Sequence, residues 1–381
     1  MHVSTIGLMA ITAGVATAKT CLDMIVQVPV TAHNGVFDKI STPQTNLDAT
    51  AFALHASTQG ANVTADALSG YATVSGIYDI SAQYCMPDNS GDSAHVLQIL
   101  THGMGFDKRL VVYWDLPYEN HNYSYVDHAL SRGYHTLAYD RLGLGKSSHG
   151  DAKSEIQSFL ELEALAQLTR MVREGSMSDS CIKQPSKIVH VGHSFGSAQT
   201  YGLTAKYPDL SDGIILTGFS MNASFMGMFI SGANFVQARF NKHQESDYSA
   251  GYFTSGDITN NMYLYFAPGH FDMDILTYAE ATKQPSTIGE LLTVASMAPE
   301  NNFGGPVYII NGDKDIPFCG GDCFATGGAA ASIAAAAEPV FPSASCFSAY
   351  IQPNTGHGIN LHHNATGAYQ QIHNFLEAHG L

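Results

Sequence analysis

Charged side chains are scarce in this sequence, and basic ones are the scarcer kind. Only 13% of the 381 residues are Asp, Glu, Lys or Arg, against roughly 25% in typical globular domains. Seventeen Lys and Arg stand against 33 Asp and Glu, which gives a formal net charge of −16. Because a negative surface repels phosphate backbones, the balance excludes nucleic-acid binding. A hydrophobic share of 45% excludes an intrinsically disordered chain.

Long apolar runs are also missing. No stretch beyond the N-terminus has 18 uninterrupted apolar residues, so no stable membrane insertion is expected. Residues 1–18 contain no Lys, Arg, Asp or Glu, and the apolar run from Val3 to Val15 is followed by Ala16-Thr17-Ala18. This pattern is typical of a secretory signal peptide cleaved after Ala18, with a buried N-terminal helix as the alternative. We therefore expect a secreted, extracellular protein.

Cysteine is too rare for a disulfide scaffold, and no two cysteines have the C-x2-C spacing of a zinc site, so no metal is expected. In an oxidising compartment six cysteines can form three disulfides, with 15 possible pairings that the sequence leaves open. They are Cys21, Cys85, Cys181, Cys319, Cys323 and Cys346. Four N-x-S/T sequons predict glycan acceptors in an exported chain. They begin at Asn62, Asn122, Asn222 and Asn364.

Short β-rich runs alternate with helical patterns along most of the chain. The predicted strands are 96–100, 136–139, 188–191, 214–217, 307–310 and 349–351. The predicted helices are 126–131, 154–175 with a capping box at Ser154 and Gln157, one after Ser194, a short crossover helix at 329–337, and a last one around 369–376. This alternation predicts an α/β fold, with a mostly parallel sheet covered by helices on both faces.

Residues 219–299 break the alternation and are rich in Phe, Met and Tyr. The segment is far longer than the dozen or so residues that a crossover needs. It is predicted to be a helical cap inserted into a core made of 19–218 and 300–381. Caps often line ligand pockets, and methionine adapts to irregular apolar shapes. Met226, Met228 and Phe229 are therefore predicted to bind substrate, although cap-core packing alone also explains them.

The strongest local motif is Gly192-His193-Ser194-Phe195-Gly196. A run of β-branched residues precedes it and a helix with small residues follows it, which is the setting of a nucleophile elbow. Such a turn lifts the serine hydroxyl clear of the sheet edge. A hydroxyl becomes a useful nucleophile only when a base takes its proton. Ser194 is therefore the predicted nucleophile.

The base and the acid are expected further along the chain, in the order serine, acid, histidine. Gly356-His357-Gly358 follows the last predicted strand, and His357 is the predicted base; His362 and His363 are its competitors. Asp313 and Asp315 both follow the strand at 307–310, and we favour Asp315 as the acid. Asp313 is then a turn residue that binds backbone N–H groups.

An oxyanion hole needs two N–H donors. Phe195, directly after the nucleophile, is predicted to supply one. Met104 is predicted to supply the other from the loop after the strand at 96–100, where Gly103 permits close backbone approach. His102 is expected to orient this loop rather than to act in catalysis.

Taken together, these motifs resemble the α/β-hydrolase superfamily, and within it secreted fungal esterases and lipases. The matching pieces lie between residues 95 and 380, and Asp140 to Ser147 is similar to a structural loop near the superfamily's site. The resemblance implies an eight-stranded sheet with a cap. Serine rather than aspartate at position 194 disfavours the epoxide hydrolase and haloalkane dehalogenase branch.

The sequence thus predicts a serine hydrolase that cleaves a carboxylic ester or lactone of a small apolar substrate through an acyl-enzyme. The expected triad is Ser194, His357 and Asp315, and no cofactor is required. A tailoring hydrolase or acyltransferase of secondary metabolism and a peptidase are alternatives on the same fold. A binding protein on a hydrolase scaffold is the alternative outside enzymes.

Overall fold

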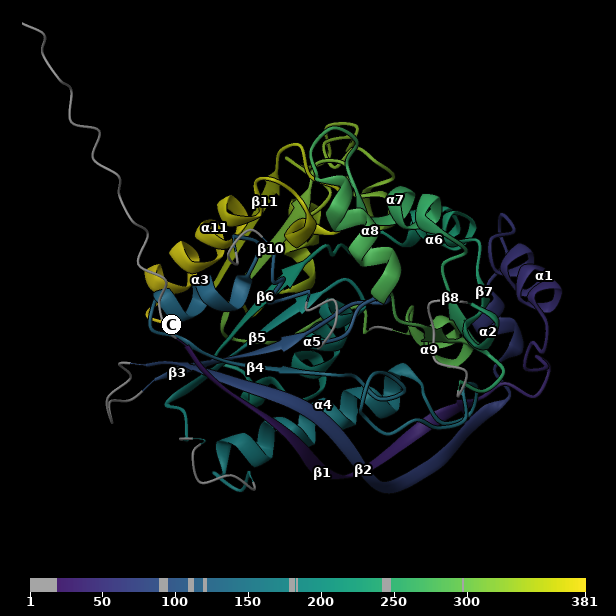
Figure 1. The fold of residues 1–381 in the computed structure, drawn as a ribbon, viewed down its shortest axis with the longest axis horizontal. Helices are drawn as coiled ribbons and strands as arrows, with labels where there is room; N and C mark the ends of the chain where they lie inside the picture. The colour runs from purple at the N-terminus through teal and green to yellow at the C-terminus, as the bar shows by residue number, and fades with distance from the viewer. Residues whose placement is uncertain are drawn as a thin grey trace, which may run out of the picture.

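The structure is a computed structural model that describes residues 19–88, 95–108, 113–118, 122–177, 182, 184–241, 248–296 and 298–381. The predicted signal peptide, residues 1–18, and Cys181 lie outside the described residues. A long twisted sheet runs through the middle of the molecule, and helices cover both of its faces (Figure 1).

The sheet has eight strands in the order β1-β2-β4-β3-β5-β6-β10-β11. Their bounds are β1 Lys19–Val36, β2 Gly70–Pro87, β3 Val96–Thr101, β4 His135–Tyr139, β5 Lys187–His193, β6 Gly213–Thr217, β10 Pro306–Gly312 and β11 Cys346–Gln352. The six strands from β4 to β11 are parallel, while β2 is antiparallel to both β1 and β4. The predicted fold class, a mostly parallel eight-stranded sheet between helices, is confirmed.

Four helices flank the sheet in two pairs. Helices α4 (Ser158–Arg173) and α5 (Phe195–Lys206) contact each other on one face, and α3 (Tyr125–Ser131) contacts α11 (Ala365–Ala378) on the other (Figure 1). Helix α4 shows why this arrangement forms, since its apolar side chains recur at helical spacing and are buried. Because the sheet is covered on both faces, its inner parallel strands β4, β3, β5, β6 and β10 are almost entirely buried, whereas the edge strand β11 is half-buried.

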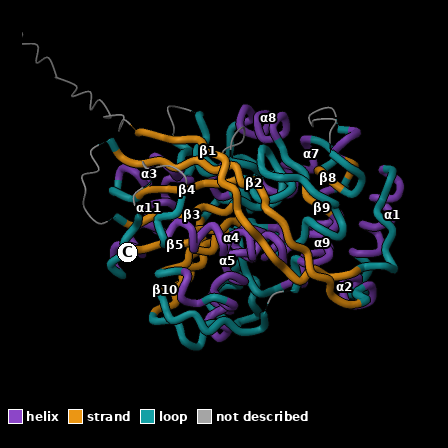
Figure 2. Tube along the Cα trace, turned by 90° about the horizontal axis from the view of Figure 1, so that it is seen from below, coloured by secondary structure: helices purple, strands orange, loops and turns teal. Residues whose placement is uncertain are grey.

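The N-terminal hairpin is a feature that the sequence pattern did not predict. Strands β1 and β2 pair over their whole length, side by side, and reach from the sheet toward α2 (Val63–Ala67) (Figure 2). Every second residue from Val26 to Ala32 is buried, as expected of a strand with one covered face. Cys21 lies opposite Cys85 in this register, and the two form a disulfide.

Two local predictions are wrong for tertiary reasons. Helix α4 begins at Ser158, and the expected capping box is absent because the Ser154 hydroxyl donates to Asp151 and the Gln157 amide binds the backbone of Gly35. The crossover at 329–337 is not an α-helix. It consists of turns that lead into a short 3-10 helix, Ala335–Val340, with a proline inside it.

Residues 219–299 lie between β6 and β10 and contain both helices and strands. The helices are α6 Met226–Ala233, α7 Ile258–Tyr265, α8 Met273–Thr282 and α9 Ile288–Thr293, and the strands β7 Val236–Gln237, β8 Tyr252–Thr254 and β9 Ser286–Thr287 form a small antiparallel sheet. The segment is therefore less purely helical than expected. Helix α1 (Asn46–Ala56), from the β1–β2 connection, packs against α6, and α2 packs against α9.

The described cysteines form two disulfides, Cys21–Cys85 and Cys319–Cys323, while Cys346 is not in a disulfide. Of the predicted sequons, Asn62 and Asn122 are exposed. No helix among the described residues is both long and apolar enough to cross a bilayer. In the same part of the chain no group of three His, Cys, Asp or Glu side chains is placed to hold a metal ion.

Candidate active site

Ser194 occupies a sharp turn between β5 and α5. Its φ of 55° and ψ of −118° lie outside the regions that side-chain-bearing residues normally adopt. The Ser194 N–H donates to the carbonyl of Thr217 on β6 at 2.9 Å, which fixes the turn at the carboxyl edge of the sheet. A strained backbone that the surrounding structure holds in place is common at functional sites.

Close backbone packing explains two glycines around this turn. A Cβ on Gly196 would lie 2.1 Å from the carbonyl oxygen of Thr101, at the end of β3. A Cβ on Gly103 would lie 2.8 Å from Cβ of Ser194. Larger residues at either position would push the loop after β3 away from the serine, so these glycines set how closely the two segments approach.

The structure brings Ser194, His357 and Asp315 together in one hydrogen-bonded chain. Ser194 Oγ lies 2.8 Å from His357 Nε2, and His357 Nδ1 lies 2.7 Å from Asp315 Oδ2. A carboxylate only accepts, so Nδ1 carries the proton and Nε2 accepts from the serine hydroxyl. Asp315 and His357 are 0% and 1% exposed, which shields the pair from water.

Asp313 and Asp315 are only two residues apart but have different partners. Besides His357, Asp315 accepts from the backbone N–H of Phe318 at 2.9 Å and from the Asn311 amide at 3.3 Å. Asp313 instead accepts from the backbone N–H of Thr355 at 2.9 Å, in the loop that precedes His357. Asp313 thus has the backbone-binding role expected of it.

The two competing histidines do not contact Ser194. His362 is buried and anchors the His357 loop: its Nε2 accepts from the N–H groups of Gly356 and Ala267, and its Nδ1 donates to the Gly358 carbonyl. Burial lowers the pKa of His362 to about 4, so its ring is neutral. His363 lies at the surface, where its ring binds Asp272.

His102 also has the loop-orienting role expected of it. Its Nδ1 donates to the Gly103 carbonyl at 2.9 Å, and its Nε2 accepts from the backbone N–H of Arg141 at 3.2 Å. Burial, together with the nearby Arg141 charge, lowers the pKa of His102 to about 3. The neutral ring therefore ties the loop that carries Met104 to the loop after β4.

The predicted oxyanion donors, Met104 and Phe195, both line the cavity beside Ser194. Phe195 is the first residue of α5, where backbone N–H groups have no partner within the helix. The carbonyl of Met104 accepts from the Tyr265 hydroxyl at 3.1 Å, which fixes this residue's backbone from the side of α7.

A buried charge cluster that the sequence pattern did not predict supports Phe195. The Arg141 guanidinium lies 4.5 Å from the centre of the Phe195 ring and forms ion pairs with Glu161 and Glu290. Burial raises the pKa of Glu161 well above its usual value; Arg141 opposes this shift and Glu290 adds to it. Arg141 belongs to the segment 140–147, expected from the motif to be structural, but its partners are 20 and 149 residues away.

His193 is a second residue whose position the motif did not reveal. Its ring lies between those of Tyr113, at 4.1 Å, and His357, at 4.8 Å. Its Nδ1 donates to Thr217 Oγ1, which itself donates to the Gly192 carbonyl. Burial lowers the pKa of His193 well below its usual value, so a neutral ring lies beside His357 and does not repel a proton held there.

A small apolar cavity of about 20 Å³ opens beside Ser194. It is lined by Met104, Ser194, Phe195, Met226, Phe229, Val294, Pro317 and Phe318. Met226 and Phe229, which are three residues apart on α6, face it together. Met228 does not line this cavity: it is two residues from Met226, on the other side of the helix, and is 38% exposed.

A larger depression, of about 580 Å³, lies between the β1–β2 connection and helices α7 and α8. None of the predicted site residues lines it. The small cavity is therefore the one that bears on the chemistry, although it is far smaller than the roughly 300–1,000 Å³ of typical ligand pockets.

Sequence comparison assigns the family. Residues 98–368 match the model of the Alpha/beta hydrolase family. The chain belongs to the α/β-hydrolase family. No curated protein has a detectable sequence match to it.

Solved structures with the same fold include a bacterial membrane phospholipase A, at 15% identity and a TM-score of 0.50, where 79% of this chain and 83% of the other are covered. An α/β-hydrolase fold protein from Chitinophaga pinensis is similar at 13% identity and a TM-score of 0.50, with 78% and 94% covered. A ferulic-acid-bound structure of Est1E from Butyrivibrio proteoclasticus has 14% identity and a TM-score of 0.49, with 79% and 96% covered. At 13% and 15% identity, the likeness to the first two structures concerns the fold alone.

Proposed function

We propose that this α/β hydrolase is a secreted serine hydrolase that cleaves a carboxylic ester, or a lactone, of a small apolar substrate. The observation that carries the proposal is the continuous chain from Ser194 Oγ through His357 to Asp315, with bonds of 2.8 and 2.7 Å. This geometry has the nucleophile, base and orienting acid that acyl transfer needs, in the order expected for the fold.

Each residue of the chain has a defined task. His357 Nε2 takes the proton of Ser194 as Oγ bonds to the ester carbonyl carbon, and Asp315 keeps the imidazole in the tautomer that can accept it. The N–H groups of Phe195 and Met104 stabilise the oxyanion. The proton then passes from His357 to the leaving alkoxide, and the acyl group stays on Ser194. Water, deprotonated by His357, releases the acid and restores the serine.

The apolar cavity supports an apolar acyl group rather than a charged one. The side chains of Met226, Phe229 and Phe318 consist only of carbon and sulfur atoms and line it. An acyl group bound here would be short, because the cavity volume of about 20 Å³ leaves little room beyond the reacting carbon.

Export is part of the proposal. The apolar start of the sequence, with its Ala16-Thr17-Ala18 ending, is typical of a signal peptide. The two disulfides, Cys21–Cys85 and Cys319–Cys323, are of the kind that persist in oxidising compartments.

Two measurements test the proposal. A fluorophosphonate probe, which reacts with activated serines, should label the folded protein at Ser194, and a p-nitrophenyl ester panel from acetate to palmitate should show turnover. Aryl lactones and amino-acid anilides in the same panel separate an esterase from a lactonase or peptidase. Absence of label on folded protein would overturn the enzyme assignment in favour of a binding protein on this fold.

A further inference from the structure

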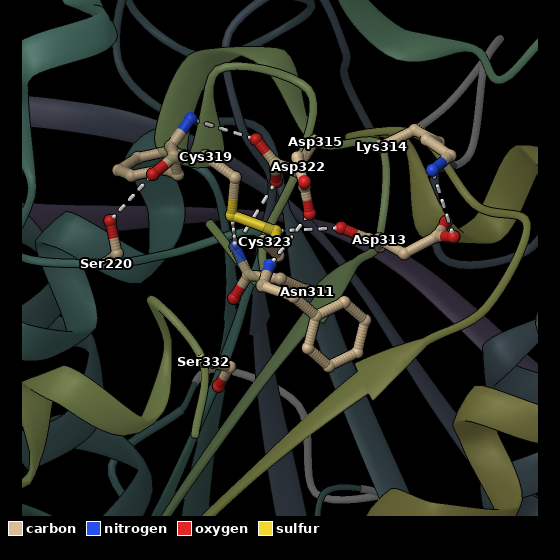
Figure 3. The surroundings of a disulfide bond; sticks show 12 residues. Ser220, Asn311, Asp313, Lys314, Asp315, Cys319, Asp322, Cys323 and Ser332 are labelled. Carbon is tan, nitrogen blue, oxygen red and sulfur yellow. Dashed lines mark hydrogen bonds and ion pairs between the residues drawn. A yellow bond between two sulfur atoms is a disulfide. The ribbon is translucent and has the colours of Figure 1, made fainter. Parts of the chain in front are cut away.

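We propose that the Cys319–Cys323 disulfide is a positioning device that holds the Asp315 carboxylate against His357. This inference rests on the proposed triad and adds a determinant of its turnover. Figure 3 shows the disulfide beside Asn311 and the turn that carries Asp313 and Asp315.

The helical turn that Asp315 caps is short and has few hydrogen bonds of its own. Asp315 is the N-cap of α10 (Ile316–Cys319), a helix of a single turn, and its Oδ1 accepts from the Phe318 N–H. An isolated turn of helix is unstable, because forming it fixes several residues for very few hydrogen bonds. Glycines at 320 and 321, both at positive φ, follow directly and give the chain no stiffness of its own.

The disulfide closes this turn back onto its own beginning. Cys319 is the last residue of α10, and its partner Cys323 donates its backbone N–H to the Asp313 carbonyl at 3.2 Å. The sulfur of Cys323 lies 3.0 Å from the carbonyl oxygen of Gly312, at the end of β10. The C-terminal end of α10 is thereby fixed to the strand from which the Asp315 turn departs.

The same closure reaches Asp315 through two contacts, one at its side chain and one at its backbone carbonyl. The Asn311 amide nitrogen lies 3.3 Å from Asp315 Oδ2 and 4.0 Å from the sulfur of Cys319. The Gly321 N–H, inside the disulfide loop, donates to the Asp315 carbonyl at 2.8 Å. Both cysteines are at most 2% exposed, so the bridge is part of the packed base of the site rather than a surface staple.

The second disulfide offers a matched control. Cys21–Cys85 joins β1 to β2, at the edge of the sheet far from β10 and the turn that carries Asp315. Removing either disulfide should lower the free energy of unfolding, since each restricts the conformations of the unfolded chain. Only removal of Cys319–Cys323 should also disturb the Asp315–His357 bond.

The test compares wild type, C319A/C323A and C21A/C85A on p-nitrophenyl acetate, at a temperature where circular dichroism shows all three folded. The kcat of C319A/C323A should fall about 10- to 100-fold, the size expected when a catalytic group shifts by about 1 Å. The kcat of C21A/C85A should stay within about threefold of wild type. Equal kcat values in all three proteins would overturn the proposal.

A proton NMR measurement reads the same bond without turnover. The His357 Nδ1 proton, bonded to a carboxylate, should give a far-downfield signal in wild type and in C21A/C85A, and Asp315→Asn assigns it by removing it. The signal should be lost or exchange-broadened in C319A/C323A. Persistence of the signal in C319A/C323A would overturn this inference, whether or not the protein hydrolyses esters. Lack of activity of wild type on every ester would instead refute the proposed function.

If C319A/C323A fails to fold, reduction replaces it. In the C21A/C85A background, dithiothreitol should lower kcat by the same 10- to 100-fold as the Cys319–Cys323 bond opens, and reoxidation should restore it. Unchanged kcat after mass spectrometry has shown both thiols reduced would overturn the proposal.

Discussion

At the scale of single residues, the proposed catalysis depends on which atom carries a proton. Asp315 accepts from His357, from Asn311 and from the Phe318 backbone, so its negative charge is met by three donors although no water reaches it. His193, the nearest ring to His357, is kept neutral by burial. The Asp315 carboxylate therefore stabilises the positive charge that His357 gains with the Ser194 proton. The neutral His193 ring does not repel that charge.

Replacement of the proposed nucleophile is the direct test at this scale. Ser194→Ala should reduce kcat by roughly 10⁴- to 10⁶-fold, because no other hydroxyl is bonded to His357 Nε2. The fold should persist, since alanine keeps the backbone hydrogen bond from position 194 to Thr217. Initial rates and circular dichroism check both expectations, and retention of a tenth of the activity would remove Ser194 from its role.

The two aspartates of the β10 turn give a second prediction with an internal control. Asp315→Asn should reduce kcat by roughly 10³- to 10⁴-fold, because the amide favours the wrong imidazole tautomer. Asp313→Asn keeps an oxygen that can accept from the Thr355 N–H and should cost less than about tenfold. Steady-state kinetics of both variants decides the assignment, and the reverse ranking would make Asp313 the acid.

At the scale of elements, the sequence reveals most where a short turn carries the signal. The elbow at 192–196 and the turns that carry Asp315 and His357 were predictable, because tight turns at strand ends need particular residues in a fixed order. The start of α4 was not, since Gln157 binds the backbone of Gly35, 122 residues away. The β1–β2 hairpin was not predicted, because the alternating residues from Val26 to Ala32 pair with a strand that begins only at Gly70.

Helix α6 also shows how composition alone misleads. Three neighbouring apolar residues were expected to contact substrate, yet a helix can turn only some of them toward one cavity. Met226 and Phe229 share that face, whereas Met228 does not. The side of α6 that faces the cavity is set by the packing of the helix against the elements around it, which composition does not reveal.

The third prediction follows from this face of α6. Wild type should prefer acetate or propionate esters, since the cavity of about 20 Å³ fills early. Met226→Ala with Phe229→Ala should move the optimum of kcat/KM to longer acyl chains, with a gain of about 0.8 kcal/mol, or close to fourfold, per accommodated CH₂. Met228→Ala, on the exposed side, is the control and should leave the profile unchanged.

The p-nitrophenyl ester panel measures these profiles. Because truncation of the buried Phe229 side chain costs about 3–5 kcal/mol of stability, the assays belong well below the melting temperature of the double variant. Superimposable profiles for wild type and the double variant would mean that Met226 and Phe229 only fill the core of 219–299.

At the scale of the whole molecule, histidines are buried throughout the sheet and its surroundings. Six of the described histidines have a pKa lowered mainly by burial. Four of these are fully buried and have a pKa of about 3 (His102, His190 and His373) or about 4 (His362). An unfolded chain binds protons at these histidines near pH ~6.5, so it holds more protons than the folded chain at every pH between the two values. Stability is therefore fully present above pH ~6.5 and is lost as the pH falls below it.

The fourth prediction is that acid unfolds this protein progressively below neutral pH. At pH 5 each of the four histidines should cost about 2 kcal/mol of unfolding free energy, following about 1.4 kcal/mol per pH unit. Glu161 acts in the opposite direction, because its raised pKa lets the folded chain bind the extra proton, and it offsets part of the loss. Urea unfolding at pH 7.5 and 5.0 measures the difference.

His190 is the position at which to test this origin of acid sensitivity. Its ring is fully buried on β5, with Thr169 Oγ1 and Ser211 Oγ each 2.9 Å from a ring nitrogen. His190→Gln keeps polar atoms toward both hydroxyls but cannot titrate, so it should recover about 2 kcal/mol of the loss at pH 5. His33→Gln, at an exposed position of β1, is the surface control. If the free energy of unfolding falls equally for His190→Gln and wild type between pH 7.5 and 5.0, groups other than His190 cause the loss of stability in acid.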